Sequence, residues 1–184
     1  MNIVLKKIEK DDLELLRKWR MQENVTKYML TDPIISIEDE INWYNKIMND
    51  DTREDYVIMA DNIRIGYYGI TNIDRNLKSC YIGFYIGDDN YRGKGLFKEI
   101  QAMAEDIIIN ELKLMSINIE VLENNPIIKT YYKIGFENSN LINRHIVKNG
   151  ESLVVINLNK QTNKQRNKQT NKQTNKQTNK HNLY

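Results

Sequence analysis

Residues 79–108 read SCYIGFYIGDDNYRGKGLFKEIQAMAEDII and place a strand, a glycine-bearing turn and a helix in direct succession. Apolar side chains alternate in the first part, as on a strand with one buried face: Cys80, Ile82, Phe84 and Ile86. After the turn, apolar side chains recur at the spacing of one helical face: Leu96, Ile100, Met103, Ala104, Ile107 and Ile108. The stretch therefore predicts a strand that leads through a tight turn into an amphipathic helix.

The turn itself, Arg92-Gly93-Lys94-Gly95, has the composition of an anion-binding site. Glycines let backbone amides approach an anion closely, and the first helical turn supplies unpaired N–H groups at the positive end of the helix dipole. The turn lacks the Gly-Lys-Ser/Thr ending of a Walker loop, and Lys98 stands where a dinucleotide fingerprint needs its third glycine. We therefore expect a ligand that carries a pyrophosphate or a similar anion.

Two helices are predicted before this stretch. Asp11-Asp12 offers an N-cap for the first, which reaches about Met29 before Thr31-Asp32-Pro33 breaks it. Ser36 and Asp39 have the spacing of a capping box, with Asp in place of the preferred Glu or Gln, and open the second. The second helix has one apolar face, made by Ile37, Ile41, Tyr44 and Met48.

The remaining apolar stretches predict strands. Turn signals separate residues 56–59, 63–73 and 79–86, which we expect to form consecutive antiparallel strands. The remaining predicted strands are residues 2–8, 56–59, 63–73, 115–122, a stretch from Phe136, and residues 153–158. Pro126 suits the first position of a short helix that stops at Gly135, and Asn149-Gly150 marks a turn before the last strand. Gly83, inside the predicted strand 79–86, is compatible with a bulge or with a close approach to another backbone.

Length and composition point to one globular domain. The chain has 184 residues, of which 40% are hydrophobic and 28% charged, as is usual for soluble domains. No apolar run reaches the roughly 18 residues that a membrane span needs, and the first residues lack a signal-peptide pattern. The single cysteine, Cys80, permits no intrachain disulfide and argues against a cysteine-based metal site. We expect a cytoplasmic protein without a bound metal.

The last 25 residues differ from the rest of the chain. Residues 160–184 repeat Asn-Lys-Gln-Thr units, hold seven of the 27 basic residues and contain no acid. The remaining 20 basic residues face all 25 acidic residues in 1–159, so that part carries a formal charge of −5 while the whole chain carries +2. The tail has no apolar residue before Leu183 and cannot bury enough surface to fold. We predict a domain over residues 1–159 and a disordered low-complexity tail over residues 160–184.

The predicted order of elements resembles the GNAT superfamily of acetyl-CoA-dependent N-acetyltransferases. Arg92-Gly93-Lys94-Gly95-Leu96-Phe97 is similar to the family's pyrophosphate loop, (Arg/Gln)-x-x-Gly-x-(Gly/Ala), with Phe97 where a small residue is usual. Asn124, followed by Tyr131-Tyr132-Lys133-Ile134-Gly135-Phe136, is similar to its second motif. The resemblance covers about residues 2–158. It implies an α/β (α+β) fold with a mixed, mostly antiparallel sheet of about seven strands flanked by about four helices.

The resemblance implies acetyl-CoA as acyl donor and assigns its contacts. The pyrophosphate would lie on Arg92, Gly93, Lys94, Gly95, Leu96 and Phe97. The pantetheine arm would enter an opening between strands 79–86 and 115–122, facing Phe84, Tyr85 and Ile86, with Asn124 holding the arm. Tyr131 matches the family's tyrosine beside the sulfur and would protonate the departing thiolate as general acid. No metal is implied.

A general base for the acceptor amine is less clearly marked. Relatives often place a carboxylate on the strand that here covers residues 79–86, and this strand contains none. Tyr81 stands nearest to that position, with Glu120, Glu123 and His145 as further candidates. A chain of water molecules is an equal alternative.

The acceptor is predicted from the first helix. Lys18-Trp19-Arg20, followed by Tyr28-Met29, resembles the UDP-amino-sugar N-acetyltransferases of pseudaminic-acid biosynthesis. This implies transfer to the 4-amino group of a nucleotide-linked amino-dideoxy sugar, with Trp19, Arg20 and Tyr81 as substrate-binding residues. An aromatic plane beside a guanidinium suits a nucleobase and a phosphate.

Other functions stay open at this point. The acceptor amine could instead belong to a protein N-terminus, a ribosomal protein, a polyamine or an aminoglycoside, and the missing strand carboxylate is compatible with a catalytically dead acyl-CoA-binding module. The basic tail suggests weak nucleic-acid binding at most. We expect a small-molecule amine as partner and no membrane, and the oligomeric state stays open, a homodimer included.

Overall fold

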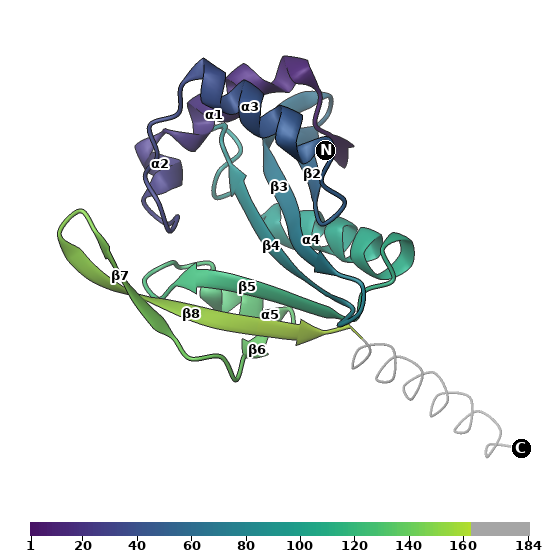
Figure 1. Cartoon of the computed structure of the whole chain (residues 1–184), viewed down its shortest axis with the longest axis vertical. Helices are drawn as coiled ribbons and strands as arrows, with labels where there is room; N and C mark the ends of the chain where they lie inside the picture. Colours follow the sequence, from purple (N-terminus) through teal and green to yellow (C-terminus); the bar gives the residue numbers. More distant parts are fainter. Residues whose placement is uncertain (163–184) are drawn as a thin grey trace, which may run out of the picture.

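The computed structural model describes residues 1–162 as one sheet covered by helices on both faces (Figure 1). Within these residues the sheet has eight strands in the order β1-β2-β3-β4-β5-β8-β6, and β7 pairs with β8 off this path. The strands are β1 (Ile3–Lys7), β2 (Glu54–Ala60), β3 (Ile63–Asp74), β4 (Ser79–Ile86), β5 (Ser116–Leu122), β6 (Glu137–Asn138), β7 (Arg144–Lys148) and β8 (Glu151–Gln161). β4 and β5 run parallel and the other described pairs are antiparallel, which confirms the predicted mixed α/β sheet.

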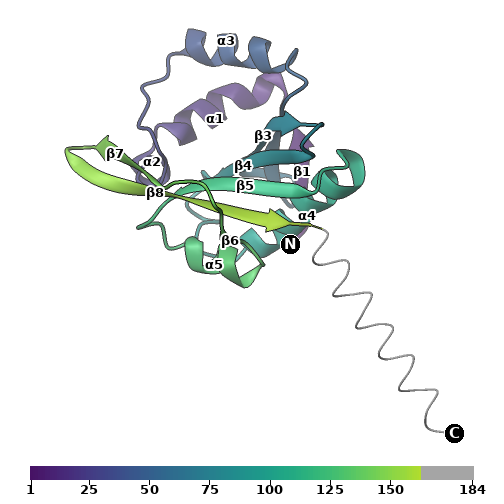
Figure 2. The ribbon, with the colours of Figure 1, turned by 60° about the horizontal axis from the view of Figure 1, so that its bottom comes forward.

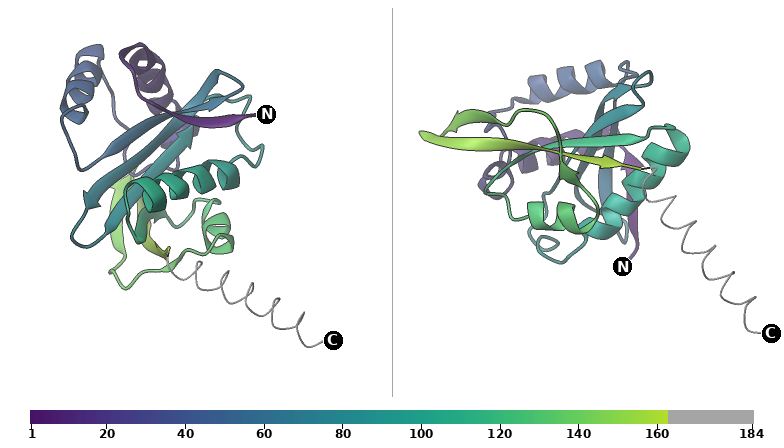
Figure 3. Two further views of the ribbon diagram at one scale, coloured as in Figure 1. Left: turned by 90° about the vertical axis from the view of Figure 1, so that its right-hand side faces the viewer. Right: turned by 90° about the horizontal axis from the view of Figure 1, so that it is seen from below.

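The helices divide between the two faces of the sheet. α1 and α3 cover one face, and α4 and α5 cover the other (Figures 2 and 3). The helical segments are η1 (Lys10–Asp12), α1 (Leu13–Arg20), α2 (Glu23–Thr26), α3 (Ile37–Ile47), α4 (Phe97–Asp106), a π-helical turn η2 (Ile107–Glu111) and α5 (Ile128–Lys133). Each face of the sheet thus has its own layer and its own cluster of buried side chains.

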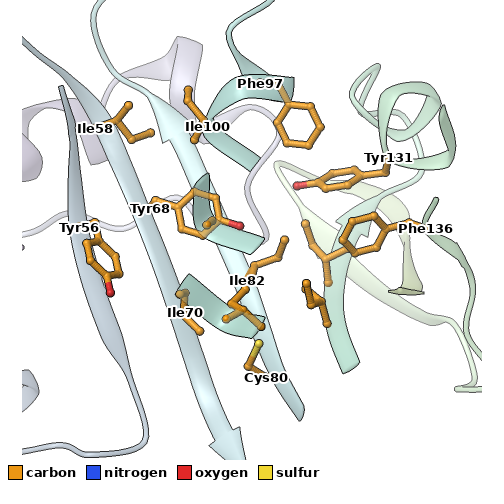
Figure 4. Packing of buried hydrophobic residues seen from close by; sticks show 14 of the residues in the cluster. Tyr56, Ile58, Tyr68, Ile70, Cys80, Ile82, Phe97, Ile100, Tyr131 and Phe136 are labelled. Carbon is orange, nitrogen blue, oxygen red and sulfur yellow. The ribbon is translucent and has the colours of Figure 1, made fainter. Parts of the chain in front are cut away.

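The alternation in β4 decides which layer each side chain joins. Cys80 and Ile82 lie in the larger core cluster with residues of α4 and α5, where Figure 4 shows Phe97 and Tyr131. Tyr85 points to the other face and packs against the smaller cluster under α1. The predicted one-sided pattern of this strand is therefore confirmed.

β4 and β5 separate after a short paired segment. Their ladder joins Ser79, Cys80 and Tyr81 to Ser116, Ile117 and Asn118. Beyond these pairs the two strands diverge, and Figure 1 shows them as the arms of a V. The later part of β4 therefore presents a backbone edge that β5 does not cover, and the predicted opening between the strands is confirmed.

Gly83 does not form a bulge. It pairs in register with Gly69 of β3, and the register shift between these strands falls between Thr71 and Asp74, where Asn72 has a φ of 48°. A Cβ at Gly83 would meet nothing within 4 Å, so this position keeps open space above the strand. The bulge alternative for Gly83 is wrong, and an open backbone remains.

Two predicted helices are shorter than expected. α1 ends at Arg20, because Gln22 adopts an extended conformation (φ −67°, ψ 135°) and caps the separate short helix α2. The prediction of one helix to about Met29 is therefore wrong. Pro126 lies in a turn ahead of α5, which begins at Ile128 rather than at the proline.

α3 turns a different face to the protein than its apolar pattern predicts. Ser36 and Asp39 form the predicted capping box, with the Asp39 amide 3.0 Å from the Ser36 hydroxyl. Ile37 and Met48, however, are 63% and 59% exposed, whereas Glu40 is only 8% exposed. The helix therefore directs a carboxyl group inward, which the apolar pattern alone did not predict.

The last strand continues past the predicted domain end. β8 runs to Gln161, and Lys160 is buried with its ammonium 2.7 Å from both oxygens of Glu105. The boundary at residue 159 is therefore wrong, because Lys160 and Gln161 belong to the sheet. The remainder of the predicted tail, residues 163–184, lies outside the described residues. Within residues 1–162, no helix has the length and hydrophobicity needed to cross a membrane.

Candidate active site

The loop between β4 and α4 has the geometry of an anion-binding turn. Gly93 and Gly95 adopt positive φ angles of 74° and 75°, which side-chain-bearing residues rarely adopt. The first backbone bonds into α4 run from the amides of Glu99 and Ile100 to the carbonyl of Leu96, 3.1 Å each. The preceding amides have no intrahelical acceptor and are available to a phosphate. The loop therefore fits a pyrophosphate.

The Arg92 guanidinium ties this loop to the end of β4. Its Nε and Nη2 donate to the Ile86 carbonyl over 3.2 and 3.0 Å, and Nη2 also donates to the Gly87 carbonyl over 3.2 Å. Nη1 pairs with the Asp89 carboxylate. Arg92 therefore fixes the conformation of the loop. Lys94 is exposed and is the cation that the loop offers to an anion.

Phe97 belongs to a row of aromatic rings under the loop. Its ring stacks on Phe84 with centroids 5.1 Å apart and meets the edge of Tyr131 at 4.9 Å. Tyr131 in turn meets Phe136 at 5.0 Å (Figure 4). The departure from a small residue at the end of the loop motif is therefore accommodated by burying the phenyl ring between β4 and α5.

Tyr131 is a buried acid within this row, between Phe97 and Phe136. Its side chain is 1% exposed, and its hydroxyl points toward Tyr68 in Figure 4. Burial raises the pKa of the Tyr131 phenol above its ordinary value. The phenol therefore stays protonated at neutral pH and can donate a proton to a developing thiolate.

The other predicted cofactor residues lie along the opening between β4 and β5. Phe84 and Ile86 are partly buried against the core shared with α4, whereas Tyr85 faces α1. Asn124 is exposed in the turn that follows β5. The structure thus brings the three β4 residues to its unpaired edge and places Asn124 at the end of the neighbouring strand.

A cavity of about 440 Å³ lies on the opposite face of β4, between the sheet and the helices α1 and α3. Gly83 gives this cavity access to the β4 backbone. Its aromatic wall consists of Tyr67 stacked on Tyr85 at 5.4 Å, with Trp43 edge-on to Tyr67 at 6.4 Å. The lining residues are Leu16, Arg20, Met29, Ile35, Asp39, Glu40, Trp43, Tyr67, Gly83, Phe84 and Tyr85.

Three charged side chains line this cavity. Arg20 Nη2 donates to the hydroxyl and the carbonyl of Thr31 over 2.8 and 3.2 Å, while Arg20 Nη1 is buried without a hydrogen-bond partner among the described residues. Asp39 is engaged by the Ser36 hydroxyl and amide, which lower the pKa of its carboxyl. Burial raises the pKa of the Glu40 carboxyl, and the charge of Arg17 opposes that rise. The cavity wall therefore carries one cation and two carboxyl groups, one with a lowered pKa and one with a raised pKa.

Trp19 packs into the core rather than lining the cavity. It is 6% exposed and lies against Gly87, where an added Cβ would be 2.1 Å from Trp19 Cδ2. Of the predicted substrate residues, the structure places Arg20 in the cavity wall, while Trp19 and half-buried Tyr81 are not among its lining residues. The prediction of Trp19 as a substrate contact does not agree with this placement.

Replacing Gly87 with alanine is expected to destabilise the fold by about 1–3 kcal/mol, because the new methyl group must displace the buried Trp19 ring. Gly83→Ala is the matched control, since a Cβ there meets nothing within 4 Å. Urea unfolding followed by tryptophan fluorescence measures both. Equal midpoints for the two variants would contradict the packing role of Trp19.

The predicted base candidates lie outside the cavity. Glu120 is paired with Arg144, whose Nη2 lies 3.1 Å from its carboxylate, and Glu123 is exposed after β5. His145 is exposed on β7, with Nδ1 3.5 Å from the Ser152 hydroxyl. The carboxyl groups that do line the cavity come from α3, which the sequence reading missed. No local signal marks them, because the side of α3 that faces the sheet depends on contacts distant in sequence.

Comparison with known proteins decides the family. The sequence profile described as an acetyltransferase (GNAT) domain matches residues 2–137. This chain belongs to the GNAT acetyltransferase family. It is 29% identical over 109 residues to the acetyltransferase PseH of Campylobacter jejuni, which covers 58% of this chain and 67% of that protein. It is 24% identical over 136 residues to spermidine N(1)-acetyltransferase of Escherichia coli K12, 73% of each chain.

Solved structures agree on the fold. Spermidine N-acetyltransferase from Vibrio cholerae, in complex with CoA and spermine, matches with a TM-score of 0.82 and 22% identity, over 88% of this chain and 96% of that one. Family membership establishes the protein as an acyltransferase that uses acetyl-CoA as donor. Within residues 1–162, no group of three or more His, Cys, Asp or Glu side chains is placed to hold a metal.

Proposed function

We propose that this GNAT acetyltransferase acetylates an amino sugar, in particular the 4-amino group of a nucleotide-linked amino-dideoxy sugar bound in the cavity over β4. The observation that carries the proposal is Arg20 Nη1, a buried guanidinium nitrogen without an acceptor among the described residues. A buried donor without a partner is costly, and sugar hydroxyls or phosphates offer the oxygens that would satisfy it. The resemblance of residues 18–29 to UDP-amino-sugar acetyltransferases supports the same acceptor.

The aromatic wall is compatible with this acceptor. Tyr67, Tyr85 and Trp43 present flat apolar surfaces, and Leu16 and Met29 add aliphatic ones. Deoxy positions of a sugar have C–H and methyl groups in place of hydroxyls, and apolar surfaces bind such groups by excluding water. The cavity thus combines an apolar platform with a few charged groups that would fix the orientation of the amine.

The residues of this chain suggest how transfer proceeds. Acetyl-CoA supplies the activated thioester when bound. The amides of the Gly93–Gly95 turn and Lys94 would hold its pyrophosphate, and the uncovered edge of β4 would bind the pantetheine amides, with Asn124 beside the arm. Tyr131 would give its phenolic proton to the thiolate as the C–S bond breaks. The thioester and the acceptor amine would then meet at β4.

A polyamine is the second candidate acceptor. Asp39 and Glu40 place two carboxyl groups in the cavity wall, and carboxylates attract ammonium groups. A protonated polyamine, however, offers only N–H donors, so it leaves the unpartnered nitrogen of Arg20 unsatisfied and places positive charge near a buried cation. The carboxyl groups favour a polyamine and the guanidinium favours an oxygen-rich acceptor.

A panel of amines tests the proposal. Release of CoA thiol would be followed with UDP-linked amino-dideoxy sugars, spermidine, spermine and aminoglycosides under identical conditions. We expect turnover of a UDP-amino sugar with a kcat/KM at least tenfold above any other amine. Turnover of polyamines or aminoglycosides without any UDP-amino sugar would reject the sugar, and binding of acetyl-CoA without thiol release for any amine would point to an inactive acyl-CoA-binding module.

Arg20→Met is expected to raise KM for the sugar acceptor by roughly 10–100-fold, because a hydrogen bond to a charged group contributes about 1.5–3 kcal/mol. Methionine keeps an apolar stem of similar length but removes the guanidinium. Lys18→Met, on the exposed side of α1, is the matched control and should leave KM within about twofold. Steady-state kinetics separates KM from kcat. Equal KM values for Arg20→Met and the control would argue against oxygen recognition by Arg20.

A further inference from the structure

We propose that Glu40 is the catalytic base that takes a proton from the acceptor amine before the amine attacks the thioester. The proposal rests on the proposed function in one respect, since it assumes that the acceptor amine occupies the cavity over Gly83. It does not depend on whether that amine belongs to a sugar or to a polyamine. It assigns a role to a side chain on α3, outside both motifs that identify the family.

The position of Glu40 is the first argument. α3 lies over the face of the sheet that carries the cavity (Figure 2), and Glu40 is 8% exposed on its inward side. Glu40 lines the same cavity of about 440 Å³ as Gly83 and Phe84. These two residues belong to the part of β4 that β5 leaves unpaired, where the thioester arm would bind. An amine that reaches the thioester from this cavity therefore lies between Glu40 and β4.

The second argument is that the other nearby carboxylates already have partners. Asp39 is held by Ser36 as the helix cap. Asp55 accepts two bonds from Arg53, at 2.7 and 2.8 Å, and a third from the Tyr67 hydroxyl at 2.6 Å. Among residues 1–162, the pKa of the Glu40 carboxyl is shifted only by burial and by the charge of Arg17, and no hydrogen bond contributes to that shift. A carboxyl group in this position can accept a hydrogen bond from an amine that binds in the cavity.

Electrostatics suit the role of a base. Burial raises the pKa of the Glu40 carboxyl and the charge of Arg17 partly offsets this, so the carboxyl titrates closer to neutral pH than an exposed glutamate. A general base works best when its pKa lies near the working pH. Glu40 also lines a second, smaller cavity between α1 and α3, together with Lys10, Glu14 and Arg17. In the cavity over Gly83, the other titratable or charged groups are Arg20, Asp39, Tyr67 and Tyr85.

The proton balance assigns one proton to each of two residues. The bound ammonium gives its first proton to Glu40, and the neutral nitrogen attacks the thioester carbonyl to form a tetrahedral adduct. As the C–S bond breaks, Tyr131 protonates the leaving thiolate, and the amide nitrogen loses its second proton, which restores the phenol. Glu40 then releases the first proton to solvent. The sum is ammonium plus acetyl-CoA giving acetamide, CoA thiol and one proton.

The test is the pH profile of Glu40→Gln with the amine that the panel identifies. We expect kcat/KM to fall about 100-fold at pH 7. Wild-type activity should be lost as pH falls through the pKa of Glu40. The variant should lack that limb and rise with pH until the amine itself is deprotonated, so the gap to wild type narrows at high pH. Glu38→Gln, exposed on the same helix, is the matched control and should keep the wild-type profile.

Two outcomes would overturn the proposal. One is a Glu40→Gln profile parallel to wild type at every pH, whatever the size of the loss, which would make Glu40 a structural or positioning residue. The other is a variant with unchanged kcat/KM. If Glu40→Gln does not fold, Glu40→Asp takes its place, and it must retain the acidic limb at a lower rate. Because the panel chooses the amine, rejection of the sugar acceptor leaves this test intact.

Discussion

Replacing Tyr131 with phenylalanine is expected to lower kcat by about 1000-fold while the Kd for CoA stays within about twofold. General acid catalysis contributes roughly 10²–10⁴-fold, and the phenol is the acid that the buried aromatic row presents beneath the loop. Phenylalanine keeps the ring contacts with Phe97 and Phe136 and removes only the hydroxyl. Stopped-flow measurement of thiol release gives kcat, and calorimetry gives the affinity for CoA.

Tyr132→Phe is the matched control for this experiment. Tyr132 is adjacent in the chain, 44% exposed, and its hydroxyl donates to Asn138 over 2.7 Å on the outside of α5. Its loss should leave kcat within about twofold, because an exposed hydrogen bond contributes at most about 1.5 kcal/mol and lies away from the cavity. A similar kcat for both variants would show that the thiolate leaves without a proton from Tyr131.

The pH dependence offers a second check on Tyr131. Its raised pKa means that the acid form persists to higher pH than in free tyrosine, so Tyr131 should produce no alkaline loss of activity below about pH 10. An alkaline limb near neutral pH that disappears in Tyr131→Phe would contradict the burial seen in the structure.

The cofactor-binding part of the site was predictable because its conformation depends on residues that are close together in the sequence. The alternation in β4, the glycines at 93 and 95 and the helical spacing of α4 depend on neighbours in the chain, and each has the conformation that its pattern indicates. The separation of β4 from β5 could be expected only from the family resemblance, since no local pattern encodes where two parallel strands stop pairing.

The acceptor half was not predictable in the same way. Trp19 and Arg20 are adjacent in the sequence, but neighbouring side chains on a helix point about 100° apart, so one enters the core and the other the cavity wall. On α3, the apolar pattern predicted Ile37 and Met48 as the buried face, and the structure buries Glu40 instead. Which side of a helix covers a cavity depends on contacts that are distant in sequence.

The end of the domain illustrates the same limit. Lys160 opens a repetitive basic segment and composition alone assigned it to a tail. Its partner Glu105 lies 55 positions earlier on α4, and Glu105 also accepts a bond from Gln101, which holds the buried hydroxyl of Tyr68. A single long-range ion pair thus moves the domain boundary, and no local pattern could have indicated it.

Truncation of the chain after Asn159 is expected to prevent stable folding, whereas truncation after Thr162 should leave stability and activity unchanged. The shorter chain loses the partner of Glu105 and the last rungs of β8, where Ile117 pairs with Lys160. It also loses Thr162, whose amide and hydroxyl donate to the Met115 carbonyl over 2.9 and 3.0 Å. Circular dichroism and the yield of monodisperse protein distinguish the two chains.

The ion pair alone should account for most of this difference. Lys160 and Glu105 are 4% and 13% exposed, and removing one partner of a buried pair typically costs about 3–5 kcal/mol, a large share of the roughly 5–15 kcal/mol that stabilises a domain. Lys160→Met in the full chain should therefore lower the free energy of unfolding by that amount. The cost arises because the Glu105 carboxylate is left without its counter-charge.

The double variant Lys160→Met with Glu105→Gln separates the pair from its surroundings. Removing both charges eliminates the uncompensated carboxylate, so we expect the double variant to recover much of the stability that Lys160→Met loses. Glutamine also keeps a carbonyl oxygen that can accept from Gln101. Additive losses of unfolding free energy in urea would show that the two side chains act independently. An unchanged free energy of unfolding for Lys160→Met would contradict the role of this ion pair in extending the domain beyond residue 159.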